Sequence, residues 1–210
     1  MIVYYTVRRK STSELSVKHS KFIAFCASVS DPDEADLFVK SIKKEYSDAT
    51  HAPYAYILGE RGDKSRASDD GEPSGTSGAP ILDAIKGEGL TNTVVVVVRY
   101  FGGIKLGTGG LTRAYGDSAL AALRVAEKDA YEKCTIYTVA CDYSAAAPIQ
   151  AKAFSQGGLC LDTSYVNGVS LTVGIPVGQE DAFLSAVADV TSGRAVIDKV
   201  EERFCRMDRR

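Results

Sequence analysis

The sequence predicts an α+β protein of two domains, covering residues 1–133 and 134–210. The run Val94–Val98 is apolar at every position, which indicates a central strand covered on both faces. Strand-like and helix-like segments alternate through both parts of the chain. After Cys134 the predicted order is βαββαβ, which is typical of a ferredoxin-like sheet with two helices on one face.

In the first domain, the pattern predicts one strand over residues 2–9 and one or two more over 13–29, of which Lys21–Val29 is the clearest. A helix follows over 31–48, with Asp31 as its N-cap and Pro32 in its first turn. The remaining predicted elements are a strand over 52–60, a polar loop over 61–78, a helix over 79–90, a strand over 91–101 and a helix over 111–130.

The second domain supplies the βαββαβ order from shorter segments. They are a strand over 135–143, a helix over 145–157, a hairpin over 158–177, a helix over 179–193 and a last strand over 194–204. The dipeptide Asn167-Gly168 is a strong signal for the hairpin turn.

Composition excludes a strongly basic nucleic-acid binder. The 210 residues are 45% hydrophobic and 25% charged, with a formal net charge of -2. Residues 1–133 carry 18 basic and 18 acidic side chains, whereas residues 134–210 carry 7 and 9. Any anion site must therefore be a local cluster of basic groups.

Several features indicate a cytoplasmic protein. The five cysteines are scattered and contain no Cys-x-x-Cys pair, which favours a reducing compartment and excludes a disulfide framework or zinc site. The N-terminus lacks the apolar segment of a signal peptide. The longest apolar run is too short to span a bilayer, so we expect no membrane contact.

A glycine-rich segment separates the apolar strand from the long helix. Its five glycines lie within nine residues, and they are Gly102, Gly103, Gly107, Gly109 and Gly110. Free N–H groups and the dipole of the following helix can bind an anion there. Arg99, Lys105 and Arg113 add positive charge nearby.

This glycine-rich segment matches neither of the common nucleotide motifs. Gly107 is followed by Thr108 instead of the Lys-Ser/Thr of a P-loop, and Thr112 stands where the last glycine of a dinucleotide motif belongs. Two interpretations stay open: the glycines contact an anionic ligand, or they permit a tight connection that packs against a neighbour.

A second motif, Ser68–Pro80, is rich in small polar side chains. Its candidate site residues are Asp69, Asp70, Gly71, Glu72, Ser74, Thr76 and Ser77. Paired carboxylates can bind a metal or share a proton, but the spacing is not that of an EF-hand. The alternative is a solvated turn braced by Asx and Ser/Thr bonds, with a helix cap.

His51 is a further candidate, as a base or as a polar residue satisfied by its neighbours. With only two histidines and no ligand-spaced cysteine pair, we expect no metal site and no cofactor. The chain also lacks a complete catalytic set, which disfavours an enzyme.

Four segments together resemble the Impact/YigZ family of conserved cytoplasmic proteins, over residues near 18–125. They are "SKFIAF", "DATHAPYAY", "SDDGEPSGTSGAPIL" and "VVVRYFGGIKLGTGGLTRAYGDS". The unit after Cys134 is similar to the smaller C-terminal domain of bacterial members. The resemblance implies folds like the fourth and fifth domains of elongation factor G, and an association with translation.

The sequence departs from the family beside His51. Many members carry a polar residue and then a cysteine or similar small residue there, whereas this chain has Ala52-Pro53. Chemistry by a cysteine at this place is therefore not expected. The kinase-pathway role of eukaryotic members belongs to proteins with an extra N-terminal domain and is not carried over.

The leading hypothesis is a cytoplasmic binding protein that contacts RNA or a ribosome-linked partner, with a role in translation regulation. The surface would join the glycine-rich segment to the loop around Asp69, Asp70 and Glu72. One alternative is a phosphate-ligand binder or small-molecule enzyme with Asp69 or Asp70 as base or metal ligand. Another is a protein-interaction module that docks a partner on the C-terminal sheet.

Overall fold

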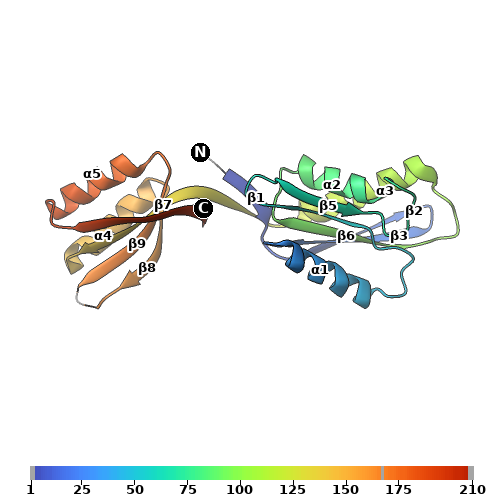
Figure 1. The fold of residues 1–210 in the computed structure, drawn as a ribbon, viewed down its shortest axis with the longest axis horizontal. Helices are drawn as coiled ribbons and strands as arrows, with labels where there is room; N and C mark the ends of the chain where they lie inside the picture. The colour runs from blue at the N-terminus through green and yellow to red at the C-terminus, as the bar shows by residue number, and fades with distance from the viewer. Residues whose placement is uncertain (1–2, 167, 208–210) are drawn as a thin grey trace. The chain divides into compact units, whose positions relative to one another are not determined.

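The computed structural model describes residues 3–166 and 168–207 and divides them into two compact units. The N-terminal unit comprises residues 4–129, and the C-terminal unit comprises residues 130–207 with Val3. Each unit has its own sheet and its own helices (Figure 1). The described residues thus form a mixed α/β structure with two sheets and five helices.

The sheet of the N-terminal unit is antiparallel, with the strand order β2-β3-β6-β4-β5. Its strands are β2 (Ser11–Val17), β3 (Ser20–Ser28), β6 (Thr93–Tyr100), β4 (Tyr54–Leu58) and β5 (Lys64–Ser68). Because β6 pairs with a strand on each side, the prediction that the valine run is a central strand is confirmed.

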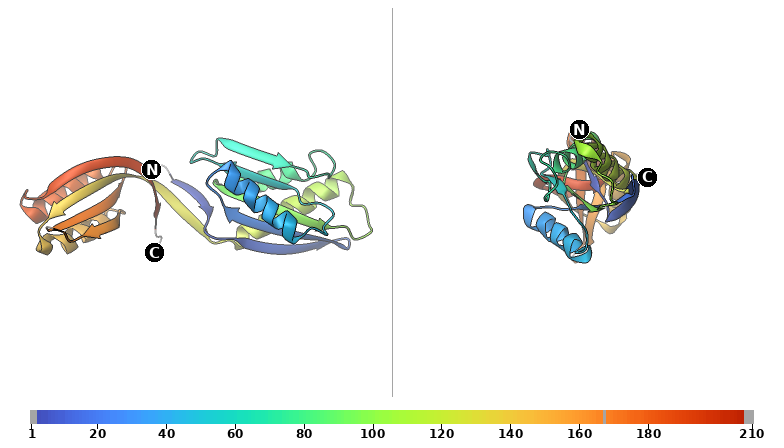
Figure 2. Two further views of the ribbon diagram at one scale, coloured as in Figure 1. Left: turned by 60° about the horizontal axis from the view of Figure 1, so that its bottom comes forward. Right: turned by 90° about the vertical axis from the view of Figure 1, so that its right-hand side faces the viewer.

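Helices cover both faces of this sheet, which explains why β6 is apolar throughout. Val95 and Val97 pack toward α2 (Gly78–Gly87) and α3 (Gly107–Val125). Val94, Val96 and Val98 pack toward α1 (Pro32–Glu45) on the opposite face. Figure 1 shows α1 on one side of the strands and α2 with α3 on the other, and the left view of Figure 2 shows α1 lying across the sheet.

The start of α1 follows the prediction from sequence. Asp31 Oδ1 accepts the N–H of Glu34 at 2.8 Å, which satisfies one of the free donors of the first turn. Glu34 Oε2 in turn accepts the N–H of Ser30 at 2.7 Å. This reciprocal arrangement has the character of a capping box and fixes where the helix begins.

Two predicted boundaries in the N-terminal unit were wrong. Residues 64–68 form the edge strand β5 instead of loop, because their backbone pairs with β4 although most of their side chains are exposed. The helix α3 begins at Gly107, four residues earlier than predicted, and ends at Val125 because β7 (Lys128–Cys141) follows.

The C-terminal unit has the predicted element order, β7-α4-β8-β9-α5-β10. Its remaining elements are α4 (Tyr143–Ser155), β8 (Leu159–Ser164), β9 (Val169–Pro176), α5 (Glu180–Thr191) and β10 (Val196–Met207). The sheet is antiparallel in the order β10-β7-β9-β8, and α4 and α5 share one apolar core with it. The strand β1 (Val3–Val7) comes first among the described elements of the chain.

The predicted hairpin turn lies only partly within the described residues. Gly168 has a φ of +113°, which suits glycine in a turn, whereas Asn167 lies outside the described residues. The strands on either side pair as the hairpin prediction requires.

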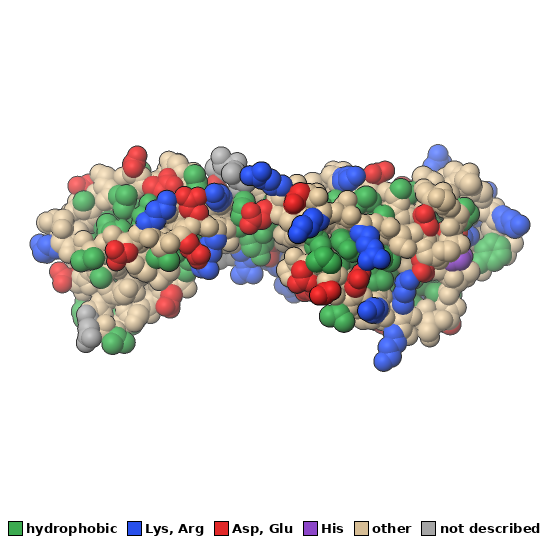
Figure 3. Space-filling model, viewed as in Figure 1, with side chains coloured by type: hydrophobic (Ala, Val, Ile, Leu, Met, Phe, Trp, Pro, Cys, Tyr) green, Lys and Arg blue, Asp and Glu red, His purple; other side chains and the backbone are tan. Residues whose placement is uncertain are grey.

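The surface carries charges of both signs. On the face seen in Figure 3, basic and acidic side chains are interspersed over both units, as the net charge of -2 suggests. Among residues 3–166 and 168–207, no helix combines the length and the apolar character needed to cross a bilayer.

The core of the C-terminal unit provides a test of the fold. Phe183 is fully buried between α5 and the sheet, whereas Phe154 on α4 is 53% exposed. We expect Phe183→Ala to lower the free energy of unfolding by about 3–5 kcal/mol, because it leaves a cavity. Phe154→Ala is the matched control and should change it by less than about 0.5 kcal/mol in urea denaturation. Equal effects of the two substitutions would contradict this packing.

Candidate functional site

Asp69 braces the loop that precedes α2. Its Oδ1 accepts the N–H of Ser77 at 3.0 Å, the hydroxyl of Ser77 at 2.8 Å and the N–H of Gly78 at 2.9 Å. Its Oδ2 accepts the N–H of Gly75 at 2.8 Å. Asp69 therefore satisfies free donors at the start of α2, where the side chain of Ser77 itself makes no capping bond.

Asp70 joins the same loop to two other segments. Its carboxylate forms an ion pair with Lys43 on α1 and accepts the N–H of Ala52 at 2.8 Å. The carbonyl oxygen of Asp70 lies 2.9 Å from Nδ1 of His51. Asp70 has a φ of +45° and Gly71 a φ of +85°, and a side chain at Gly71 would crowd the ring of His51.

Glu72 reaches into the interior, where it meets two partners. Its Oε1 lies 2.5 Å from Nη1 of Arg99 and accepts the hydroxyl of Tyr115 at 2.7 Å. The side chains of Glu72 and Arg99 are only 3% and 7% exposed. The Arg99 guanidinium also lies 5.6 Å from the ring centres of Phe22 and Phe101.

This arrangement changes the role expected of Arg99. Sequence suggested a free cation beside the glycines, but the alternation of β6 places Arg99 on the same face as Val95 and Val97, toward α3. Its charge is consequently neutralised by Glu72. Its Nε is buried without a hydrogen-bond partner among the described residues.

The glycines of the glycine-rich segment serve different purposes. A Cβ on Gly102 would lie 2.0 Å from the backbone of His19, so Gly102 permits close packing. Gly103 and Gly107 have φ values of +84° and +72°, which let the chain turn into α3. Gly109 is exposed in the first turn of α3, and Gly110 faces Leu106 in that turn.

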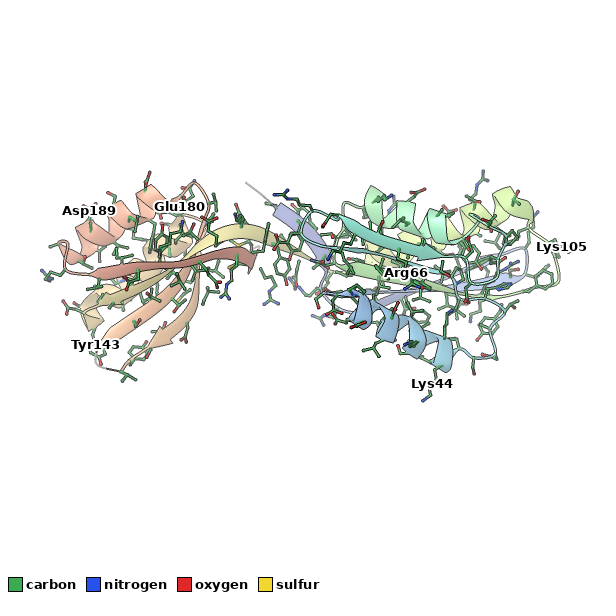
Figure 4. The ribbon with its side chains drawn as sticks, in the orientation of Figure 1. Lys44, Arg66, Lys105, Tyr143, Glu180 and Asp189 are labelled. Atoms are coloured by element: carbon green, nitrogen blue, oxygen red, sulfur yellow. The ribbon has the colours of Figure 1, made fainter. Side chains whose placement is uncertain are left out.

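The first turn of α3 leaves donors open to solvent. The N-cap residue Leu106 provides no side-chain cap, and Gly107, Thr108 and Gly109 are exposed. Their N–H groups have no helical partner and no hydrogen bond to any other described residue. Lys105 is exposed beside them and forms no ion pair with a described residue; Figure 4 labels it between β6 and α3.

A pocket of about 430 Å³ brings the two motifs together. Its lining residues from the two motifs and His51 are His51, Glu72, Arg99, Lys105, Gly107 and Thr108, and the others are Thr50, Pro73, Phe101, Leu106 and Leu111. The pocket does not include Asp69, Asp70, Ser74, Thr76, Ser77 or Arg113. Arg113 is exposed on α3, and Ser74 is exposed in the loop.

Several lining or supporting residues were not identified from sequence. In the sequence, Phe101, Leu106 and Leu111 look like ordinary core or loop positions. Tyr115 and Lys43 are distant in sequence from Glu72 and Asp70, and only the fold brings them into contact. For Phe101 a signal was present in the sequence "YFGG", where an aromatic residue stands between the strand and the glycines. In the structure Phe101 is 47% exposed.

The carboxylates of Asp69, Asp70 and Glu72 are bonded to donors of the protein itself, so they brace the loop. Both oxygens of Asp69 and of Asp70 accept hydrogen bonds or an ion pair, and Glu72 is paired with Arg99. Within the described part of the chain, no three His, Cys, Asp or Glu side chains gather as ligands for a metal.

The hydrogen bonds to Asp69 and Asp70 lower the pKa of each carboxyl. Burial by itself raises the pKa of Asp69, but the N–H groups of Gly75, Gly78 and Ser77 and the Ser77 hydroxyl outweigh it. Burial likewise raises the pKa of Asp70, and the bond from Lys43, the N–H of Ala52 and nearby positive charge outweigh it. Both groups are therefore held as carboxylates.

Comparisons with known proteins cover both units. The model of the Impact N-terminal domain matches residues 18–123, and a domain of unknown function, DUF1949, matches residues 139–194. These matches take in both motifs of the pocket and most of the βαββαβ segment.

Similar proteins extend over nearly the whole chain. "IMPACT family member YvyE" of Bacillus subtilis is 35% identical over 94% of this chain and 91% of its own. "IMPACT family member YigZ" of Escherichia coli is 36% identical over 89% of this chain and 92% of its own. A solved structure described as a hypothetical protein is 34% identical, with a TM-score of 0.63 over 96% of this chain and 98% of that one.

The buried ion pair generates a stability prediction. We expect Glu72→Ala to lower the free energy of unfolding of the N-terminal unit by about 3–5 kcal/mol, because Arg99 would stay buried without its partner. The double substitution of Glu72→Leu with Arg99→Met should recover part of this loss. Glu60→Ala, at an exposed glutamate, is the control and should change stability by less than about 0.5 kcal/mol. A loss as small as that control in urea denaturation would contradict the pairing.

The lowered pKa of Asp69 generates a pH prediction. Its stabilising effect is complete above about pH 5 and is lost as pH falls through the folded-state pKa, because the protonated carboxyl accepts these bonds poorly. Asp69→Asn should therefore be less stable than the wild type at pH 7, and this difference should shrink steadily between about pH 5 and pH 2. Thermal unfolding across that range measures it, with Asp83→Asn on the exposed face of α2 as control. A difference that does not change with pH would contradict the role of the carboxylate.

Proposed function

The chain belongs to the IMPACT family, and from that premise we propose that it is a cytoplasmic binding protein whose N-terminal unit holds phosphate groups of RNA. The proposed contact is the pocket between His51, Arg99 and the start of α3. Binding there would serve translation, in line with the association that the family resemblance implies.

The observation that carries this proposal is the open start of α3 beside Lys105. Three consecutive exposed residues, Gly107, Thr108 and Gly109, have N–H groups without a described partner, and the positive end of the α3 dipole lies at the same place. Lys105 adds a full charge at the pocket wall. Such a combination favours phosphate oxygens, which position a nucleic acid without reading its sequence.

Fold relationships support the same proposal. We propose that the N-terminal unit resembles the fourth domain of elongation factor G, and that the C-terminal unit, with its strand order β10-β7-β9-β8, is ferredoxin-like. Because fold alone does not define function, the pocket remains the principal argument.

A second candidate function follows from the size of the pocket. A volume of about 430 Å³ lies within the range of small-molecule sites, and most of its wall is apolar with a few polar groups. A small phosphorylated ligand would use the same N–H groups and Lys105. The carboxylates Asp69 and Asp70 would brace the site and take no part in chemistry.

RNA binding through phosphates predicts a strong dependence on salt. Affinity for a single-stranded RNA should fall steeply between 50 and 200 mM salt, roughly, as counterions compete for phosphate contacts. Lys105→Ala should weaken binding and reduce the slope of log affinity against log salt by about 1, and Arg113→Ala should have a smaller effect because Arg113 lies outside the pocket. Fluorescence anisotropy measures both quantities.

Lys86→Ala is the matched control for these variants, since Lys86 is an exposed lysine in the last turn of α2 and does not line the pocket. It should leave affinity and slope unchanged. Affinity that ignores salt, or an equal loss in Lys86→Ala and Lys105→Ala, would contradict the proposal. Binding of a sugar phosphate or nucleotide without any binding of RNA would favour the second candidate.

A further inference from the structure

The orientation of His51 gives the pocket a second chemical preference. Nδ1 of His51 lies 2.9 Å from the carbonyl oxygen of Asp70, which can only accept a hydrogen bond. Nδ1 must therefore carry the proton, and in the neutral ring Nε2 keeps its lone pair. The edge of the ring with Nδ1 and Cε1 faces Gly71.

Nε2 of His51 is available to a ligand. His51 lines the pocket, and no described residue forms a hydrogen bond with its Nε2. Nε2 is also not among the buried polar atoms that lack a partner, so it retains access to solvent. A group that binds there must donate a hydrogen bond.

The pocket consequently combines two unlike hydrogen-bonding requirements. The start of α3 and Lys105 require an acceptor with negative charge, whereas His51 requires a donor such as a hydroxyl. Arg99, whose side chain is only 7% exposed, also lines the pocket; its buried Nε–H has no described partner and would need an acceptor, as the N–H groups of α3 do.

The rest of the pocket wall is mostly apolar. Phe101 is 47% exposed and lines the pocket, as do Pro73, Leu106 and Leu111. An exposed aromatic ring suits the flat face of a nucleobase, because stacking tolerates every base. A ligand that matches all three regions carries a phosphate, a flat ring and a hydroxyl donor.

We propose that the pocket accommodates one ribonucleotide unit, with its phosphate at the start of α3 and its ribose 2′-hydroxyl donating to Nε2 of His51. This inference rests on the proposed function for the phosphate contact, and it adds that the site distinguishes RNA from DNA. The 2′-hydroxyl is the group that separates the two polymers chemically. The unit is either part of an RNA strand or a free nucleotide, since both present the same groups.

The test compares four probes with the full-length chain. They are a single-stranded RNA, the DNA of the same sequence, a ribonucleoside 5′-monophosphate and its 2′-deoxy counterpart. If the wild type binds the polymers, it should bind RNA about 3- to 10-fold more tightly than DNA, and if it binds the nucleotides, the same preference should hold for the ribonucleotide over its 2′-deoxy counterpart. This is the range for one hydrogen bond. Anisotropy serves for the polymers and calorimetry for the nucleotides.

Two substitutions of His51 separate recognition from structure. Asn can place its amide nitrogen where Nδ1 lies, so His51→Asn keeps a donor for Asp70 and removes the acceptor in the pocket. Its preference for the ribo form should disappear, while DNA affinity changes by less than about twofold. His51→Gln can place its amide oxygen near Nε2 and should retain part of the preference. Lys105→Ala should weaken RNA and DNA alike.

The outcomes distinguish this inference from the proposed function. Equal affinity for RNA and DNA, with loss of both in Lys105→Ala, would overturn the inference and leave the phosphate site in place. Equal losses for RNA and DNA in His51→Asn would also overturn it, because His51 would then only support the loop. Ribo-selective binding of the free nucleotide alone would support the inference and reject RNA as its source. No binding of any probe would reject both.

Discussion

The ion pair between Glu72 and Arg99 is the interaction on which the site depends. Two charges taken out of water are tolerated only because they meet at 2.5 Å and Tyr115 donates a further bond to Glu72. The pair joins the loop before α2 to the central strand β6, and Tyr115 adds α3. Three elements that are distant in sequence thereby hold one position, and the pair itself, Glu72 with Arg99, forms part of the pocket wall.

The loop around this pair is ordered by successive carboxylates that point to different parts of the N-terminal unit. Asp69 holds the start of α2, Asp70 holds Lys43 and the backbone at Ala52, and Glu72 holds β6. The left-handed backbone at Asp70 makes this divergence feasible, at a conformational cost that the surrounding bonds offset. Acidic residues that resemble a metal site in sequence thus act as internal braces, and they orient His51 through the carbonyl of Asp70.

The contrast between this loop and the start of α3 explains where a ligand would bind. The carboxylates of the loop are matched by protein partners, whereas the N–H groups of Gly107–Gly109 and Nε2 of His51 have none among the described residues. Folding has therefore left both unsatisfied donors and an unsatisfied acceptor at one pocket. Relatives from Bacillus subtilis and Escherichia coli match this chain over about nine tenths of its length, so the similarity extends over both units.

The sequence by itself determined the features that depend on local pattern. The central strand at Val94–Val98, the cap at Asp31, the βαββαβ order and the family follow from periodicity, turn chemistry and motifs within short segments. Only the tertiary structure decided that Arg99 is neutralised by Glu72, 27 residues away, and that residues 64–68 form an edge strand. The physical reason is that an ion pair or a strand pairing depends on which residues the fold brings within about 3 Å of one another. The pattern of a short segment does not determine its distance from residues far away in the sequence.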